Sequence, residues 1–181
     1  MKLRIVVFSF LTFFSLNSCF EEQDFDQFDD LDVVQTIEGS ILYIESPEAL
    51  INLTNQSEFY NSTFNYDAFN EGLFADRVLE GIITYQIENT TSKPFNVIVE
   101  FISEDGEVLD TEEFIISEAP TSIVNRDVAY GGTSNKDIEI ITGTSSFKIS
   151  AFNLGDYTST ATTPNPKIIL RSSGKFKVLI K

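Results

Sequence analysis

The chain of 181 residues has no histidine, no tryptophan and a single cysteine, and its 12 basic residues are outnumbered by 28 acidic ones. The absence of histidine excludes Ser–His and Cys–His nucleophile pairs and removes the usual nitrogen ligand of zinc, copper and iron. Carboxylate chemistry is left, either an acid pair of the glycosidase kind or an oxygen-ligand calcium site. Because spacing selects no pair among so many carboxylates, we expect a protein that is not an enzyme and holds no metal or other cofactor.

The excess of negative charge limits the partners further. The formal net charge is -16 at pH 7. Nucleic acids and anionic lipid surfaces carry charge of the same sign, so the sequence predicts no nucleic-acid partner. The lone cysteine excludes an intrachain disulfide, and stability must come from an ordinary packed core.

The N-terminal segment has the pattern of a secretory signal. Two basic residues precede an apolar run over residues 5–16, and Ser18 and Cys19 follow it. The run is too short to span a bilayer and ends at a small residue, as signal peptides do. This stretch resembles the lipobox of bacterial lipoproteins, in which the cysteine is lipidated and begins the mature protein. We therefore expect residues 1–18 to be a signal peptide and Cys19 to be a lipid anchor; the alternative is an ordinary secretory signal with an incidental cysteine.

Residues 19–32 are dominated by acidic side chains. Such a run of like charge is typical of a solvated tether. Glu21 and Glu22, directly after the expected lipidation site, resemble the export signal that sends Bacteroidota lipoproteins to the outer face of the cell. A plain tether and a calcium site are the alternatives, although the aspartate spacing fails the EF-hand pattern. Phe25 and Phe28 are unusual for a spacer and are candidates for docking on a partner.

From Val33 onward the pattern is that of β-strands. Apolar side chains alternate with polar ones, and turn residues such as Asp105-Gly106 recur between the apolar segments. No long helical stretch is present. The sequence predicts an all-β, immunoglobulin-like antiparallel β-sandwich over residues 33–181, after the signal peptide and the acidic tether. The alternation places one set of side chains in its core: Ile83, Tyr85, Ile87, Val97, Val99, Phe101, Phe147, Ile149, Phe176 and Val178.

Three local patterns give more specific expectations. Ser46-Pro47-Glu48 predicts a short helix with serine as its cap and proline at its first position. The isoleucines Ile138, Ile140 and Ile141 predict a strand over residues 138–141. Ser172-Ser173-Gly174 predicts the turn of a final hairpin between residues 168–170 and 176–180.

Four further motifs carry a family resemblance. They are Phe64-Asn65-Tyr66-Asp67, the segment from Leu79 to Thr90 with its Asn-Thr-Thr turn, residues 101–106, and residues 170–176. In this order they resemble a family of small outer-membrane lipoproteins of Flavobacteriia, a class of Bacteroidota, over most of residues 60–181. The motifs are turns and core positions, so the resemblance implies a fold and an anchored location and carries over no catalytic residue.

Residues 55–76 are rich in aromatic side chains but irregular. One interpretation is a strand near residues 63–66 whose following loop packs over the edge of the sandwich. The other is a contact surface, for which Phe59, Tyr60 and Phe69 are the candidate binding residues. We expect a lipid-anchored protein of the outer membrane, facing the cell surface, that acts as a non-enzymatic interaction module or accessory subunit of an outer-membrane assembly. The alternative is a lipoprotein that binds a glycan or a peptide; a carboxylate enzyme is the remaining class.

Overall fold

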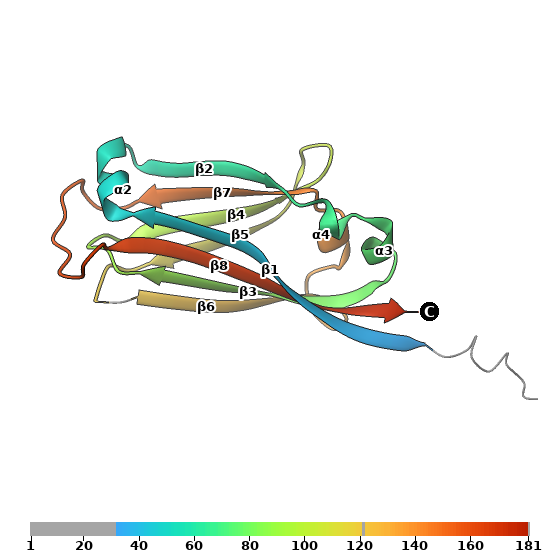
Figure 1. The fold of residues 1–181 in the computed structure, drawn as a ribbon. Coiled ribbons are helices and arrows are strands. Elements are labelled where there is room, and N and C mark those ends of the chain that lie inside the picture. The colour runs from blue at the N-terminus through green and yellow to red at the C-terminus, as the bar shows by residue number, and fades with distance from the viewer. Residues whose placement is uncertain (1–31, 121, 181) are drawn as a thin grey trace, which may run out of the picture. The chain divides into compact units, whose positions relative to one another are not determined.

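A computed structural model describes residues 32–120 and 122–180, of which Val33–Ile180 form one compact unit. Two four-stranded antiparallel sheets stack face to face in this unit (Figure 1). The first sheet contains, in spatial order, β1 (Val33–Pro47), β8 (Lys167–Ile180), β3 (Val78–Asn89) and β6 (Ser122–Gly131). The second contains β2 (Glu58–Asn65), β7 (Ser146–Asn153), β4 (Phe95–Ile102) and β5 (Val108–Ile116). The predicted all-β antiparallel sandwich is confirmed.

The order of the strands, which the sequence left open, is not that of an immunoglobulin domain. Every connection crosses between the sheets except the β4–β5 hairpin, and β1 pairs with β8, β2 with β7, β3 with β6 and β4 with β5. A long double ribbon rolled up in this way is a jelly roll. An immunoglobulin domain would instead divide seven strands into sheets of four and three. Period-two patterning sets which face of a strand is buried but not which strand lies beside it, so the alternation could not separate the two arrangements.

The core lies between the sheets and is filled by alternate residues of each strand. All ten predicted core side chains are buried, and Ile87, Val99 and Phe101 have no exposed surface. β4 shows the pattern most regularly, because every second residue from Phe95 to Phe101 is buried while its neighbours are partly exposed. The pleat of a strand sends successive side chains to opposite faces, which is why the sequence located this core.

Short helical segments connect the strands at the two ends of the sandwich. They are α2 (Glu48–Thr54), η2 (Asp67–Phe69), α3 (Gly72–Ala75) and α4 (Glu139–Thr142). Helix α2 begins one residue later than predicted, with Pro47 as its cap and no cap from Ser46. The predicted strand over residues 138–141 is wrong. A short apolar run does not distinguish a strand from a helical turn, and here the Asp137 carboxylate accepts the N–H of Glu139 (3.1 Å) while Ile141 is buried.

The predicted final hairpin is also wrong, because β8 runs without a break through Ser172-Ser173-Gly174. The small residues serve packing rather than a turn. Phe176 lies opposite Gly81 on β3, and its ring covers both Gly81 and Gly174, so a Cβ atom at either glycine would overlap the ring. By contrast, the Asp105-Gly106 turn joins β4 to β5 as predicted, with Gly106 at φ 82°.

Candidate functional site

A hollow of about 220 Å³ lies between the edge strand β1 and the segment η2–α3. Figure 1 shows α3 at one end of the sandwich. β1 lines it with Ile37, Glu38, Gly39 and Ile41, and β8 contributes Phe176. The other wall comes from the segment that follows β2, through the side chains Tyr66, Ala68, Phe69 and Phe74. The hollow is therefore mostly apolar and aromatic, and it is built from three parts of the chain that are distant in sequence.

The aromatic wall is held by ring contacts centred on Phe69. The Phe69 ring lies 4.6 Å from Tyr66 and 5.2 Å from Phe176, both edge-on, and stacks on Phe74 at 5.5 Å. Phe147 of the core packs edge-on against it from below, with the centroids 6.0 Å apart. Offset and edge-to-face pairs of this kind stabilise a fixed arrangement of rings. The wall is thus continuous with the core, and the hollow is preformed.

The elements that line the hollow also carry exposed apolar and acidic side chains. Ile37 is 44% exposed and Leu73, on α3, is 77% exposed. Asp67, Glu71 and Asp76 on the η2–α3 segment are all exposed. This end of the domain therefore offers apolar contact area beside an acidic border formed by Asp67, Glu71 and Asp76.

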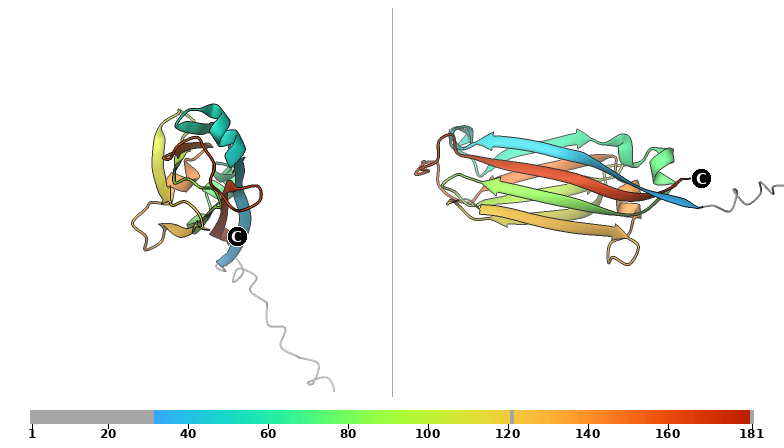
Figure 2. Two further views of the ribbon diagram at one scale, coloured as in Figure 1. Left: turned by 90° about the vertical axis from the view of Figure 1, so that its left-hand side faces the viewer. Right: turned by 60° about the horizontal axis from the view of Figure 1, so that its bottom comes forward.

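The strand β1 has one edge free beside this hollow. It lies at the margin of the first sheet and, within the described part of the chain, its residues pair with β8 alone. Residues 33–40 are exposed along their whole length, until the register shift between Ser40 and Leu42. Figure 2 shows this half of β1, in blue, at the same end of the sandwich as the helices that follow β2.

The predicted site residues do not lie together in the structure, and some of them lie outside the described residues. Cys19, Glu21 and Glu22 lie outside the described residues. Phe69 is 3% exposed, so the expectation that it presents a free ring is wrong: it forms the floor of the aromatic cluster. Phe59 and Tyr60 are half-buried against the core.

These candidates also do not form one surface. Phe59 and Tyr60 begin β2, whereas Phe69 follows its other end, and at 3.3 Å per residue the strand between them spans about 20 Å. Phe59 packs edge-on against Phe95 at 5.2 Å, between the two sheets. The packing interpretation of residues 55–76 is the one that the structure supports. The sequence did not predict that Ile37, Ile41 and Phe176 line a common hollow, because only the pairing of β1 with β8 brings them together.

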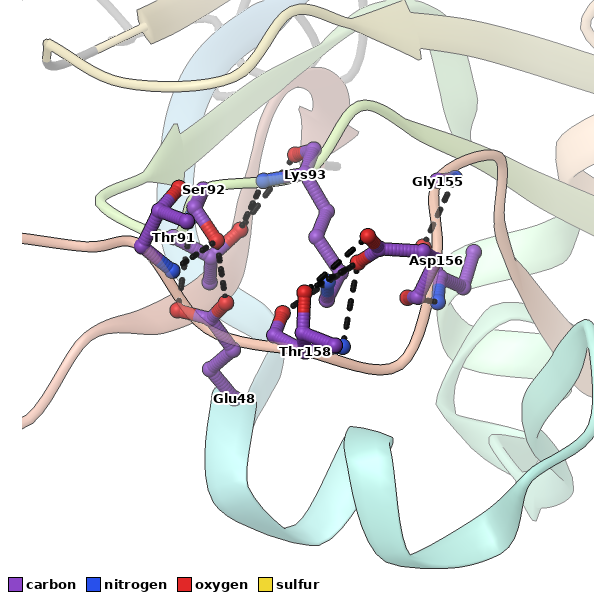
Figure 3. A network of polar contacts seen from close by, with 9 residues as sticks. Glu48, Thr91, Ser92, Lys93, Gly155, Asp156 and Thr158 are labelled. Carbon is purple, nitrogen blue, oxygen red and sulfur yellow. Dashed lines mark hydrogen bonds and ion pairs between the residues drawn. The ribbon is translucent and has the colours of Figure 1, made fainter.

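A polar network occupies the opposite end of the domain, around the start of α2 (Figure 3). The buried Lys93 ammonium donates to the Asp156 carboxylate (2.6 Å) and to the Thr158 carbonyl. The buried Glu48 carboxylate accepts from the Ser92 hydroxyl (2.6 Å) and amide (3.3 Å). These bonds join α2, the β3–β4 turn and the β7–β8 loop, so the network acts as a clasp between loops.

The clasp has an electrostatic consequence for Asp156. The hydrogen bond from Lys93, helped by bonds from Thr158, lowers the pKa of Asp156 from 3.8 to about 2. The carboxylate therefore stays ionised across the physiological range, and it neutralises the buried ammonium. A Ser–Glu contact with a nearby lysine is a possible catalytic arrangement in general, but the Ser92 oxygen also accepts the Thr160 amide (3.2 Å) and is bound within the loops.

A second polar cluster closes the sandwich between β5 and β6. Lys136 donates to Asp110 and to Glu112 (2.7 Å), and Arg126 donates to Glu112 (3.1 Å). Partial burial lowers the pKa of Lys136, but its bonds to both carboxylates outweigh this and leave the pKa above its ordinary value. Burial raises the pKa of the neighbouring Tyr130. Two carboxylates are thus paired with two cations. This arrangement links the two sheets and does not resemble a catalytic acid–base pair.

Within residues 32–120 and 122–180, no group of three or more cysteine, aspartate and glutamate side chains is arranged to hold a metal ion. Among the helices of the same ranges, none is long and apolar enough to cross a membrane.

Comparisons with known proteins give no family. No protein-family model matches the chain, and no curated protein matches it significantly. Among solved structures, the VP2 subviral particle of infectious bursal disease virus is 14% identical over 83% of this chain and 33% of that chain, with a TM-score of 0.35. The chain thus spans about a third of the length of VP2.

Two other solved structures match over most of their length. Desmodium yellow mottle tymovirus is 8% identical over 83% of this chain and 89% of that chain, with a TM-score of 0.35. A protein of the disulfide-linked pili that form Bacillus endospore appendages is 7% identical over 81% and 89%, with a TM-score of 0.34. At such scores these likenesses carry no information about the function of this chain.

Proposed function

We propose that this protein is a non-enzymatic interaction module, anchored in the outer membrane through a lipid on Cys19 and displayed outside the cell through Glu21 and Glu22. The main observation in support of this proposal is the aromatic hollow beside β1, an open apolar site on an otherwise strongly acidic domain. Preformed apolar hollows with exposed apolar rims are typical of surfaces that bind proteins or ligands.

The two polar clusters favour binding over catalysis. In each of them, the cation and the carboxylates are engaged with one another across loops or strands. A hydrolase of the carboxylate type needs one acid with a raised pKa beside one ionised carboxylate. Here the shifted carboxylate, Asp156, has its pKa lowered rather than raised.

A protein or peptide partner fits the hollow better than a glycan does. Glycan sites combine an aromatic platform with several polar groups that bind hydroxyls. The charged side chain in the lining is Glu38, which is paired with Lys175 (2.8 Å). The lining is otherwise apolar apart from the Tyr66 hydroxyl and backbone groups, which suits an apolar side chain of a protein.

The test is co-purification from gently solubilised membranes of the producing cell. Ile37→Lys places a charge at the mouth of the hollow, and Ile115→Lys is its matched control, because Ile115 is an exposed isoleucine (71%) on β5, an edge strand of the other sheet. We expect a stoichiometric membrane companion with the wild type and Ile115→Lys, and its loss with Ile37→Lys at unchanged circular dichroism. Equal recovery with both variants would show that the hollow is not the binding site.

A further inference from the structure

The free edge of β1 and the aromatic hollow lie side by side, and together they define a mode of binding. We infer that an extended segment of a partner protein pairs with residues 33–40 as an added strand of the first sheet and places one large apolar side chain in the hollow. This inference rests on the proposed function. It follows a known mode of recognition, in which backbone hydrogen bonds supply affinity and a pocket for a side chain supplies specificity.

The first half of β1 lacks the usual protection of an edge strand. Exposed edges are normally blunted by charges, bulges or covering segments, because their backbone groups invite pairing. The edge strand β5 carries Asp110 and Glu112, stapled to Lys136. Residues 33–40 instead expose the apolar side chains of Val33, Val34 and Ile37, with a single charge at Glu38. The backbone hydrogen bonds described for this stretch run to β8, which leaves its outer edge available.

The length of this edge is set by the structure. It begins with β1 at Val33 and ends at the irregularity between Ser40 and Leu42, where a bulge bends a strand out of register. Eight residues at 3.3 Å each give an edge of about 26 Å, enough for a pairing partner of similar length. Ile37 and Ile41 place the hollow at the inner end of this edge, so one side chain of an added strand can reach the aromatic wall.

The acidic side chains beside the hollow indicate the charge of the partner segment. Asp67, Glu71 and Asp76 are exposed on the segment that forms the aromatic wall, and the whole chain carries a net charge of -16. Lysine or arginine residues beside the apolar side chain would be attracted by this border, whereas a second copy of this acidic chain would be repelled. The partner segment is therefore an extended, basic strand with an aromatic or large aliphatic residue.

The experiment uses the whole chain in detergent and a labelled peptide, Lys-Thr-Val-Phe-Val-Thr-Lys. One control peptide replaces both valines with proline, which removes two backbone donors and blocks strand pairing. A second replaces phenylalanine with alanine. We expect fluorescence anisotropy to show at least tenfold weaker binding of both control peptides. Ile37→Lys should weaken binding of the first peptide by a similar factor, and Ile115→Lys should leave it unchanged.

Amide hydrogen exchange identifies the mode of binding. Addition of the first peptide should slow exchange at alternate amides of residues 33–40. Slowing confined to residues 66–74 would refute strand addition and leave the hollow as a binding site. Slowing of residues 33–40 that depends on protein concentration without peptide would refute it in favour of a second copy. An affinity that is unchanged by the proline substitutions or by Ile37→Lys would also overturn the inference. This holds even if the membrane companion of the proposed function were found.

Discussion

The position of the Phe176 ring permits a quantitative test of how this side chain packs on the first sheet. Its ring lies against Gly81 on the neighbouring strand and Gly174 on its own strand, with no space for a Cβ atom at either position. Gly81→Ala therefore forces the ring out of place in a close-packed interior. Overpacking of this kind typically lowers the free energy of unfolding by about 1–3 kcal/mol.

The companion change is Phe176→Ala, which should lower the free energy of unfolding by about 3–5 kcal/mol, as removal of a buried phenylalanine does. Phe176→Ala removes the three ring atoms that lie nearest to a methyl group at position 81. Gly81→Ala should then cost close to nothing, and the double variant should be more stable than the sum of the single changes by about 1–3 kcal/mol.

Urea unfolding of the four proteins, followed by circular dichroism, gives these free energies. Gly39→Ala is the matched control, because Gly39 also lies in a strand of the first sheet and a Cβ atom there has no neighbour within 4 Å. It should be neutral or raise the free energy of unfolding by up to about 1 kcal/mol. Additive effects of Gly81→Ala and Phe176→Ala, or equal effects of Gly81→Ala and Gly39→Ala, would refute the packing described for this ring.

Three further predictions concern the anchor, the export signal and the loop clasp. Cys19→Ala should yield a protein that no longer partitions with the membrane after processing, since buried acyl chains supply the anchoring free energy; a processed variant that still needs detergent for extraction would contradict this. Replacement of Glu21 and Glu22 by alanine should reduce cleavage by protease added outside the cell while the membrane-bound amount stays constant, and unchanged cleavage would leave only a tether. Asp156→Asn should lower the Tm more than Lys93→Met, because it leaves a buried ammonium without its counter-charge. The pKa of Asp156 is lowered, so the difference between wild type and Asp156→Asn should persist above pH 3.8 and vanish as the pH falls through about 2; a constant difference down to pH 1 would contradict the assignment.

The sequence was sufficient to predict which face of a strand is buried, but not which strands lie side by side. Val97, Val99 and Phe101 could be assigned to the core because alternation is a local property of a pleated strand. Ser172-Ser173-Gly174 was misassigned because small residues favour turns when only local propensity is considered. Their place in β8 depends on the Phe176 ring, a contact that no local pattern contains.

The candidate site was predictable only in part, for the same reason. The composition of residues 55–76 indicated a group of aromatic side chains, but not which of their rings face solvent. Phe69 is buried by Phe147 and Phe176, which come from strands far along the chain. The apolar residues of β1 were visible in the sequence, yet a central and an edge strand look alike until the sheet order is known.

The position of β8 has a consequence for when this domain can fold. The last strand of the chain lies between β1 and β3 in the first sheet, and Val33 pairs with Ile180. β3 and β6 can pair without β8, but the first sheet cannot be completed until residues 167–180 are available, because β1 pairs with β8 alone in the described part of the chain. Such a high contact order makes folding slow. Among the described residues, β1 therefore stays without a strand partner until nearly the whole of residues 33–180 has been synthesised.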